Sequence, residues 1–200
     1  MDLDANRTAW FKSKREKAVD SFRANFERGS LVKVGLTSPG YMHAYAWQGG
    51  EEVLRRCSMV QEVQENELSE LLGLYLYLHK KSVPKITERL KSTQETILKD
   101  RNHYIIVNEV DAMLLSSCVC VITPNLTRNV RPYALAENVV TRGDCRGKGY
   151  ATECLHYARK VAQEANCYKR MLLTGAKEEA TLSFYSNAGY NSGGKTAFVQ

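Results

Sequence analysis

Hydrophobic positions change their period several times along the chain, and each change predicts a different element. Residues 7–28 are polar and basic, with apolar side chains interleaved at helical spacing, which predicts an amphipathic helix that ends at Gly29. Residues 30–55 hold short apolar runs between turn residues, which predicts a hairpin or an irregular linker. From Cys57 the pattern becomes regular, and residues 57–63 predict a strand.

Two helices and a hairpin follow. Asn66 is a suitable N-cap for the first helix, and a proline suits the start of a second helix over about 84–99. The first helix presents one apolar face, formed by Leu68, Leu71, Leu72, Tyr75 and Leu78. Residues 103–110 and 112–122 predict two strands that are joined as a hairpin through a turn at 109–111.

The second half of the chain alternates strands and helices. A loop over 123–132 leads into a strand over 133–140, and later strands are predicted over 168–174 and 196–199. A helix over 178–188 lies between the last two strands. The helix that follows the strand at 133–140 carries one apolar stripe, formed by Ala151, Leu155, Ala158, Val161, Ala162 and Ala165.

A glycine-rich turn at 146–151, with the sequence RGKGYA, separates the strand at 133–140 from this helix. Glycine permits positive φ and a close approach of the backbone to a ligand, and the unpaired N–H groups of a helix start bind phosphate. The turn spells neither a P-loop nor the dinucleotide fingerprint, because Thr152 stands where the third glycine of GxGxxG would be. It predicts an anionic cofactor, and the alternative is a strand-to-helix turn without a ligand.

Four motifs of the C-terminal half occur together and in order. Residues 146–151 fit the pattern Gln/Arg-x-x-Gly-x-Gly/Ala, an Asn-Val-Val strand precedes them, and a helix ending in 166–169 (NCYK) follows. Residues 184–190 (FYSNAGY) are similar to a helix end of the form FYxxxGF/Y. On these motifs the chain resembles the GNAT superfamily of acyl-CoA-dependent N-acyltransferases, strongly over 133–200 and plausibly from about Ser58.

The resemblance implies a fold and a domain division. It is closest to the small-molecule branch that includes glucosamine-phosphate N-acetyltransferases, through residues 145–148 and 166–169. The implied fold is α/β (α+β), the GNAT fold, with a mixed, mainly antiparallel central sheet flanked by helices on both faces. Residues 56–200 would form the acetyltransferase domain, and 1–55 an N-terminal extension of unknown function. Only ten residues follow Tyr190, where the family usually has two further strands, so the sheet edge is either short or completed in a homodimer.

The resemblance also implies roles for particular residues. Acetyl-CoA would be the co-substrate, held by Arg146, Gly147, Lys148, Gly149, Tyr150 and Ala151 at its pyrophosphate and by Asn138, Val139 and Val140 along its pantetheine arm. The N–H of Val139 or Val140 would polarise the thioester carbonyl. Glu137, expected to share a strand face with Leu135 and Val139, would be the general base, and Tyr185 would protonate the departing thiolate.

Each of these roles has a structural alternative. Glu137 could be a salt-bridged glutamate at a sheet edge, and Tyr185 a packed aromatic whose hydroxyl bonds elsewhere. Asn138 is expected to point to the opposite strand face and to serve structure. Cys145 lies beside the phosphate turn, but no histidine partner is evident in the sequence, which disfavours covalent catalysis.

The leading hypothesis is an enzyme, an acetyl-CoA-dependent N-acetyltransferase that moves the acetyl group directly to a primary amine of a small molecule. One alternative acceptor is a protein or peptide amine. Another alternative is a non-catalytic acyl-CoA-binding regulatory module. A nucleic-acid-associated protein using the basic segment 7–28 is a third class, but the sequence carries no RNP, KH or helix-turn-helix signature.

Composition bears on the charge of the ligand, the cellular compartment and the presence of a metal site. The net charge is +6, and an anionic cofactor accounts for basic residues near Arg146 and Lys148 without any nucleic acid. No apolar run approaches ~18 residues and the acidic N-terminus lacks a secretory signal, so we expect a cytoplasmic protein without a membrane partner. The six cysteines form no CxxC pair and the four histidines are scattered, so we expect reduced thiols and no metal.

Overall fold

The computed structural model describes residues 41–43, 58–79, 85–194 and 196. The predicted helix at 7–28 lies outside these residues. So do most of the segment at 30–55 and nearly all of the predicted strand at 196–199.

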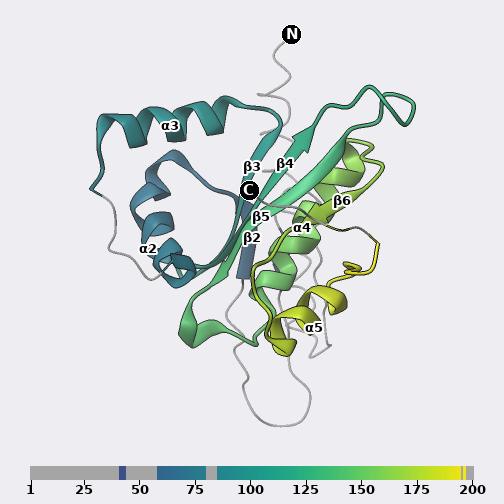
Figure 1. Cartoon of the computed structure of the whole chain (residues 1–200). Coiled ribbons are helices and arrows are strands. Elements are labelled where there is room, and N and C mark those ends of the chain that lie inside the picture. Colours follow the sequence, from purple (N-terminus) through teal and green to yellow (C-terminus); the bar gives the residue numbers. More distant parts are fainter. Residues whose placement is uncertain (1–40, 44–57, 80–84, 195, 197–200) are drawn as a thin grey trace, which may run out of the picture.

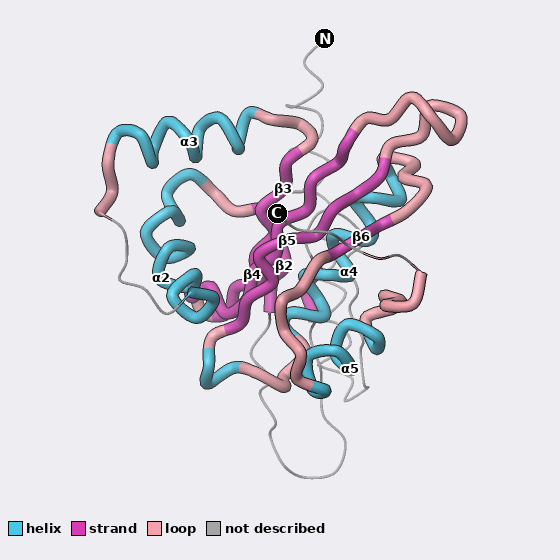
Figure 2. Tube along the Cα trace, viewed as in Figure 1, coloured by secondary structure: helices cyan, strands magenta, loops and turns pink. Residues whose placement is uncertain are grey.

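A six-stranded sheet runs through the described part of the chain (Figures 1 and 2). Its strands lie side by side in chain order: β1 (Tyr41–His43), β2 (Ser58–Glu62), β3 (His103–Val110), β4 (Met113–Thr123), β5 (Tyr133–Thr141) and β6 (Arg170–Leu172). The first five strands pair antiparallel, whereas β6 runs parallel to β5. The predicted mixed, mainly antiparallel sheet is confirmed, and β1 adds to it an edge strand from the segment before residue 56.

Helices cover both faces of this sheet, as Figure 1 shows. On one face a 3-10 turn, η1 (Glu65–Glu67), leads into α2 (Leu68–His79), and α3 (Glu88–Lys99) follows. On the other face lie α4 (Tyr150–Glu164), preceded by the 3-10 turn η2 (Gly143–Cys145), and α5 (Glu179–Asn187). From β2 to α5 the order of strands and α-helices is the one that the sequence predicted.

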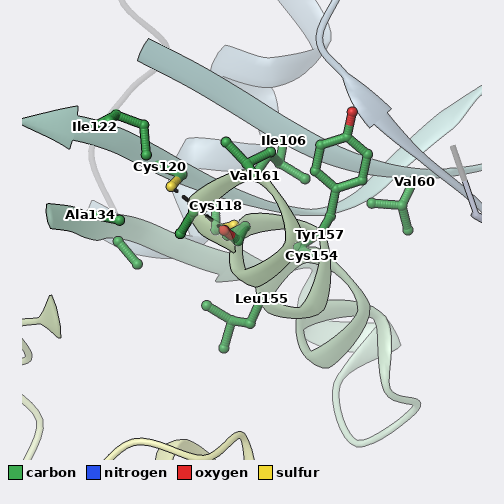
Figure 3. Close-up of a cluster of buried hydrophobic side chains, with 13 residues drawn as sticks. Val60, Ile106, Cys118, Cys120, Ile122, Ala134, Cys154, Leu155, Tyr157 and Val161 are labelled. Atoms are coloured by element: carbon green, nitrogen blue, oxygen red, sulfur yellow. Dashed lines mark hydrogen bonds between the residues drawn. The ribbon is translucent and has the colours of Figure 1, made fainter. Parts of the chain in front are cut away.

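The larger hydrophobic core lies between the sheet and α4 (Figure 3). Leu155, Ala158, Val161 and Ala162 of the predicted stripe are buried there, together with Cys154 and Tyr157. They meet alternate residues of the strands: Val60, Ile106, Cys118, Cys120, Ile122, Ala134 and Ala136. Because the Tyr157 hydroxyl donates to a carboxylate oxygen of Glu62 at 3.4 Å, its polar end is satisfied although the ring is buried.

Two helix starts differ from the sequence prediction. Asn66 is not an N-cap, since it lies inside η1, and Gln64 caps this turn instead by donating its N–H to the Glu67 carboxylate at 2.5 Å. The second helix begins at Glu88, four residues later than predicted, because the Thr87 side chain accepts a first-turn N–H and fixes the start there.

The predicted hairpin between β3 and β4 is confirmed with a slightly later turn. Asp111 and Ala112 form its two-residue loop, and both have positive φ, at 51° and 60°. A two-residue loop with positive φ at both positions matches the right-handed twist of the flanking strands. The hairpin sets β3 and β4 in register, which matters below because both strands support the candidate site.

Candidate functional site

A β-bulge in β5 marks the candidate site. Val119 of β4 pairs with Glu137, and Ser117 pairs with Val140, so β5 has one more residue than β4 between these pairs. Asn138 adopts the left-handed conformation, with φ of 51°, which asparagine tolerates better than most residues. The extra residue makes the strand bend and leaves Asn138 exposed.

The bulge corrects the predicted strand face. Strict alternation would place Val139 beside Leu135 and Glu137, but Val139 packs against the core under α4, together with Ala136. Val140 instead is buried in the core under α2. The physical reason is that one inserted residue reverses the facing of every later side chain in the strand.

A gap opens between β5 and β6 directly beside the bulge. The two strands pair only from Ala134 to Ala136, opposite Arg170 to Leu172, while β5 continues to Thr141. The predicted strand at 168–174 is therefore shorter, because the chain leaves the sheet after Leu172. Over 137–141 the β6 side of β5 has no strand partner within the described residues, so its backbone can pair with an extended ligand.

Glu137 lies on the α2 side of this gap. Its cross-strand partner Val119 is buried in the core under α2, and directly paired residues face the same side of a sheet. The Glu137 side chain is half-buried. It therefore reaches the gap from the face that α2 covers.

Tyr185 of α5 approaches the same gap from the opposite face. Its ring packs against the core under α4 and against the rings of Phe184 and Tyr190, with centroids 5.0 Å and 6.4 Å away. Burial raises the pKa of the Tyr185 hydroxyl above its ordinary value, and the neighbouring Cys118 adds to the rise. The Thr174 side chain opposes the shift, and the charge of Glu137 adds a smaller rise. The phenol is therefore protonated at neutral pH and close enough to Glu137 to feel its charge.

The glycine-rich turn forms an open cradle at the start of α4. Gly147 and Gly149 have φ of 73° and 92°, and a Cβ built at either one would meet no heavy atom within 4 Å. Gly149 is the N-cap of α4, and the first intrahelical bond is donated by Glu153 to the Gly149 carbonyl, at 3.0 Å. The N–H groups of Tyr150 and Ala151 thus have no helical acceptor and are available to an anion.

Two apolar anchors hold this turn, one on each side of it. Cys145 and Tyr150 pack into the same small cluster, with Val110 of β3 and Leu115 of β4. Burial of Cys145 in this cluster gives its thiol a packing role, in keeping with the expectation that it is not a nucleophile. The turn between the anchors stays exposed while its ends are fixed.

The two basic side chains of the turn are both exposed but differ in contacts. Lys148 donates from Nζ to the carbonyl of Asp144 at 3.0 Å, so its ammonium is held over the turn. Asp144 in turn accepts from Nε of Arg142 at 3.3 Å. Arg146 extends from the exposed surface beside the glycines. Together with the free N–H groups, these cations suit the pyrophosphate of a CoA ester, so the residues present fit this group.

Sequence reasoning assigned Tyr75 of α2 to the apolar helix face and missed its polar end. Tyr75 packs against the core under α2, and burial raises the pKa of its hydroxyl to about 12, while the neighbouring Ser117 side chain opposes the shift. Since Ser117 pairs with Val140 beside the bulge, the Tyr75 hydroxyl lies at the α2 side of the site. A helical tyrosine at apolar spacing gives no signal of this kind in the sequence.

The described residues hold no group of three or more His, Cys, Asp or Glu side chains placed to bind a metal ion. Among the helices of the described ranges, none combines the length and apolar character that spanning a bilayer requires.

Comparisons with known proteins agree with the fold. A "Putative acetyltransferase from Agrobacterium tumefaciens str. C58" is 34% identical, with a TM-score of 0.67, over 70% of this chain and 97% of that chain. Glucosamine-6-phosphate N-acetyltransferase from Arabidopsis thaliana is 17% identical, with a TM-score of 0.61, over 72% of this chain and 96% of that chain.

A third solved structure contains a ligand related to CoA. AAC(6')-Iy in complex with the bisubstrate analog CoA-S-monomethyl-acetylneamine is 13% identical, with a TM-score of 0.59, over 72% of this chain and 97% of that chain. Both structures below 25% identity support the fold alone. Among curated proteins, none matches this chain significantly.

The family model described as "Acetyltransferase (GNAT) family" matches residues 66–190. This match covers more than half of the chain, and it includes the bulge, the gap, the glycine-rich turn and α5. Proteins of this family use acetyl-CoA as the acyl donor. The chain therefore belongs to the Acetyltransferase (GNAT) family and is an acyltransferase enzyme.

Proposed function

We propose that this enzyme transfers an acetyl group from acetyl-CoA directly to the primary amine of a small molecule. The observation that carries the proposal is the gap between β5 and β6, which has a carboxylate on one side and a protonated phenol on the other. Such an arrangement lets the acceptor enter from the α2 face while the thioester lies along the open edge of β5.

Each group would then have one task. The pyrophosphate would lie on the N–H groups at the start of α4, beside Arg146 and Lys148. The backbone of Asn138, Val139 and Val140 would pair with the pantetheine arm, and an N–H of Val139 or Val140 would polarise the thioester carbonyl. The bulge supports this role, because it turns the backbone of β5 away from regular pairing just where the strand has an open edge.

Proton transfers complete the reaction. A free alkylamine has a pKa near ~10.4, so the acceptor must lose a proton before its lone pair can attack the carbonyl carbon. Glu137 would take this proton through a water before the C–N bond forms. As the C–S bond breaks, Tyr185 would give its proton to the thiolate. The nitrogen then loses its second proton to solvent, the phenol regains one from solvent, and the products are the N-acetyl compound and CoA with a free thiol.

The proposed acceptor is a small amine because of the fold neighbours and the local sequence resemblance. One neighbour is named for glucosamine-6-phosphate, and residues 145–148 and 166–169 resemble the branch that includes such enzymes. Release of CoA should be measured over a panel of amino sugars, aminoglycosides, polyamines, amino acids and peptides. Turnover of a small amine supports the proposal, turnover confined to peptides favours the alternative acceptor, and acetyl-CoA binding without turnover favours a regulatory module.

The role of Glu137 is tested by Glu137→Gln with the best amine of the panel. Because the amide cannot accept the proton, we expect kcat to fall by about 10²–10⁴-fold and the pH dependence of the rate to change. Glu164→Gln is the matched control, since this exposed carboxylate on α4 forms an ion pair with Lys160, at 3.9 Å, and its substitution should leave the rate unchanged. An unchanged pH profile with only KM raised would make Glu137 a substrate contact and not a base.

A further inference from the structure

A buried polar network joins the start of α4 to the strands beneath it. Asn108 of β3 is fully buried, on the strand face where Ile106 packs into the core. Its Nδ2 donates to the Glu153 carboxylate at 2.5 Å and to the Tyr150 carbonyl at 3.5 Å. Ser58 of β2, also buried, donates its hydroxyl to the same Glu153 oxygen at 3.1 Å.

These bonds hold the part of the helix on which the phosphate cradle depends. Tyr150 and Glu153 both belong to the first turn of α4, whose N–H groups face the glycine-rich turn. Asn108 belongs to β3 and Ser58 to β2, so hydrogen bonds from two different strands hold the first turn of α4. Nearby, Val110 of β3 fixes the ring of Tyr150, so the end of β3 supplies a polar and an apolar anchor.

The stability of the fold alone does not account for a buried asparagine at position 108. Its Oδ1 atom is buried and has no hydrogen-bond partner among the described atoms, although an unsatisfied buried acceptor destabilises a fold. A leucine, whose side chain has the same branched arrangement of heavy atoms, would continue the apolar face begun by Ile106 and remove the unpaired amide oxygen. The amide is therefore most readily explained by the two bonds that it donates to α4.

We infer that Asn108, Glu153 and Ser58 are positioning residues that set the first turn of α4 for the pyrophosphate of acetyl-CoA. The inference rests on the proposed function, because it assumes that acetyl-CoA binds at this turn. Asn108→Leu removes both bonds to α4, and the affinity for acetyl-CoA should fall about tenfold because the turn is no longer held in its binding position. At saturating acetyl-CoA, kcat should be nearly unchanged, since Glu137 and Tyr185 lie on other elements.

The experiment is calorimetry with acetyl-CoA on the full chain, combined with KM, kcat and thermal unfolding. Gln94→Leu is the matched control, because this buried amide donates to the Glu65 carbonyl at 2.9 Å. Gln94 belongs to α3, on the opposite face of the sheet from α4. This substitution should lower stability without changing the Kd. Ser58→Ala removes one bond only, and a rise in Kd smaller than that of Asn108→Leu is expected, so the inference can be tested even if Asn108→Leu fails to fold.

Substitutions of Glu153 distinguish a positioning role from an effect of its negative charge on phosphate binding. Glu153→Gln keeps an acceptor oxygen for Asn108 and Ser58, so its Kd should stay near that of the wild type, whereas Glu153→Leu should match Asn108→Leu. If both Glu153 variants bind acetyl-CoA more tightly, the carboxylate acts by repelling phosphate and the inference is wrong. It is also wrong if Asn108→Leu and Ser58→Ala lower stability but leave Kd unchanged. Wild-type protein that does not bind acetyl-CoA would overturn the proposed function as well.

Discussion

At the scale of single residues, Asn138 decides where the site lies. The alternating pattern of residues 133–140 was sufficient to predict a strand, and β5 confirms it. The same pattern assumed a period of two throughout, so it could not reveal the inserted residue or the reversed facing of Val139 and Val140. Asparagine tolerates positive φ, but it does so in many turns, and nothing local in the sequence distinguishes a bulge from a regular pair.

Tyr185 carries a prediction of its own at this scale. Tyr185→Phe should lower kcat by about 10²–10⁴-fold and change acetyl-CoA affinity little, because only the proton for the thiolate is lost. Tyr190→Phe is the matched control, since its ring lies 6.4 Å from that of Tyr185 in the same cluster. Steady-state kinetics and calorimetry measure both effects.

The pH dependence follows from the same residue. A proton donor must be protonated, and burial raises the pKa of Tyr185 above the ordinary 10.0, so the activity that depends on it persists through neutral pH and is lost only above that value. Wild-type turnover in Tyr185→Phe would assign Tyr185 to the packed-aromatic role that the sequence left open.

At the scale of elements, the presence of each helix was easier to predict than the residues at which it begins and ends. The apolar stripe of α4 was readable because its period of 3.6 is repeated four times, yet Cys154 and Tyr157 were missed. A cysteine and a tyrosine give ambiguous signals, and both are buried here because the helix packs against four strands, β2 to β5. The shortening of β6 was not readable, since Leu173 continues the apolar run although the chain has already left the sheet.

The glycine-rich turn is tested at this scale by two substitutions of Gly149. Gly149→Val strains the left-handed backbone and fills the open space, so it should abolish acetyl-CoA binding. Gly149→Asn keeps the left-handed conformation at low cost but still places a side chain over the turn, so it should retain thermal stability and weaken binding at least tenfold. Gly73→Ala in α2 is the control, because it also meets open space but has no positive φ. If Gly149→Asn binds as tightly as the wild type, the phosphate does not lie above Gly149.

At the scale of the whole molecule, the order of elements was the most predictable property. Turn residues separate the apolar runs from residue 57 onward, and a mixed sheet with helices on both faces follows from that order together with the family motifs. The contribution of β1 was not predictable, because three residues in a segment of weak pattern carry too little signal. Pairing between β1 and β2 links the segment before residue 56 to the strand that carries Ser58.

The proposed boundary near residue 55 leads to a prediction for shortened chains. A chain that begins at Tyr41 keeps β1 and should bind acetyl-CoA with the wild-type Kd, because every proposed contact lies between Glu137 and Tyr185. A chain that begins at Leu54 loses the β1 ladder and should unfold at lower temperature, with a Kd that stays within about threefold if β2 keeps its place. Calorimetry, circular dichroism and mass in solution measure affinity, folding and pairing of subunits together. A folded chain from Leu54 that cannot bind acetyl-CoA would place the N-terminal segment in the active site and move the boundary.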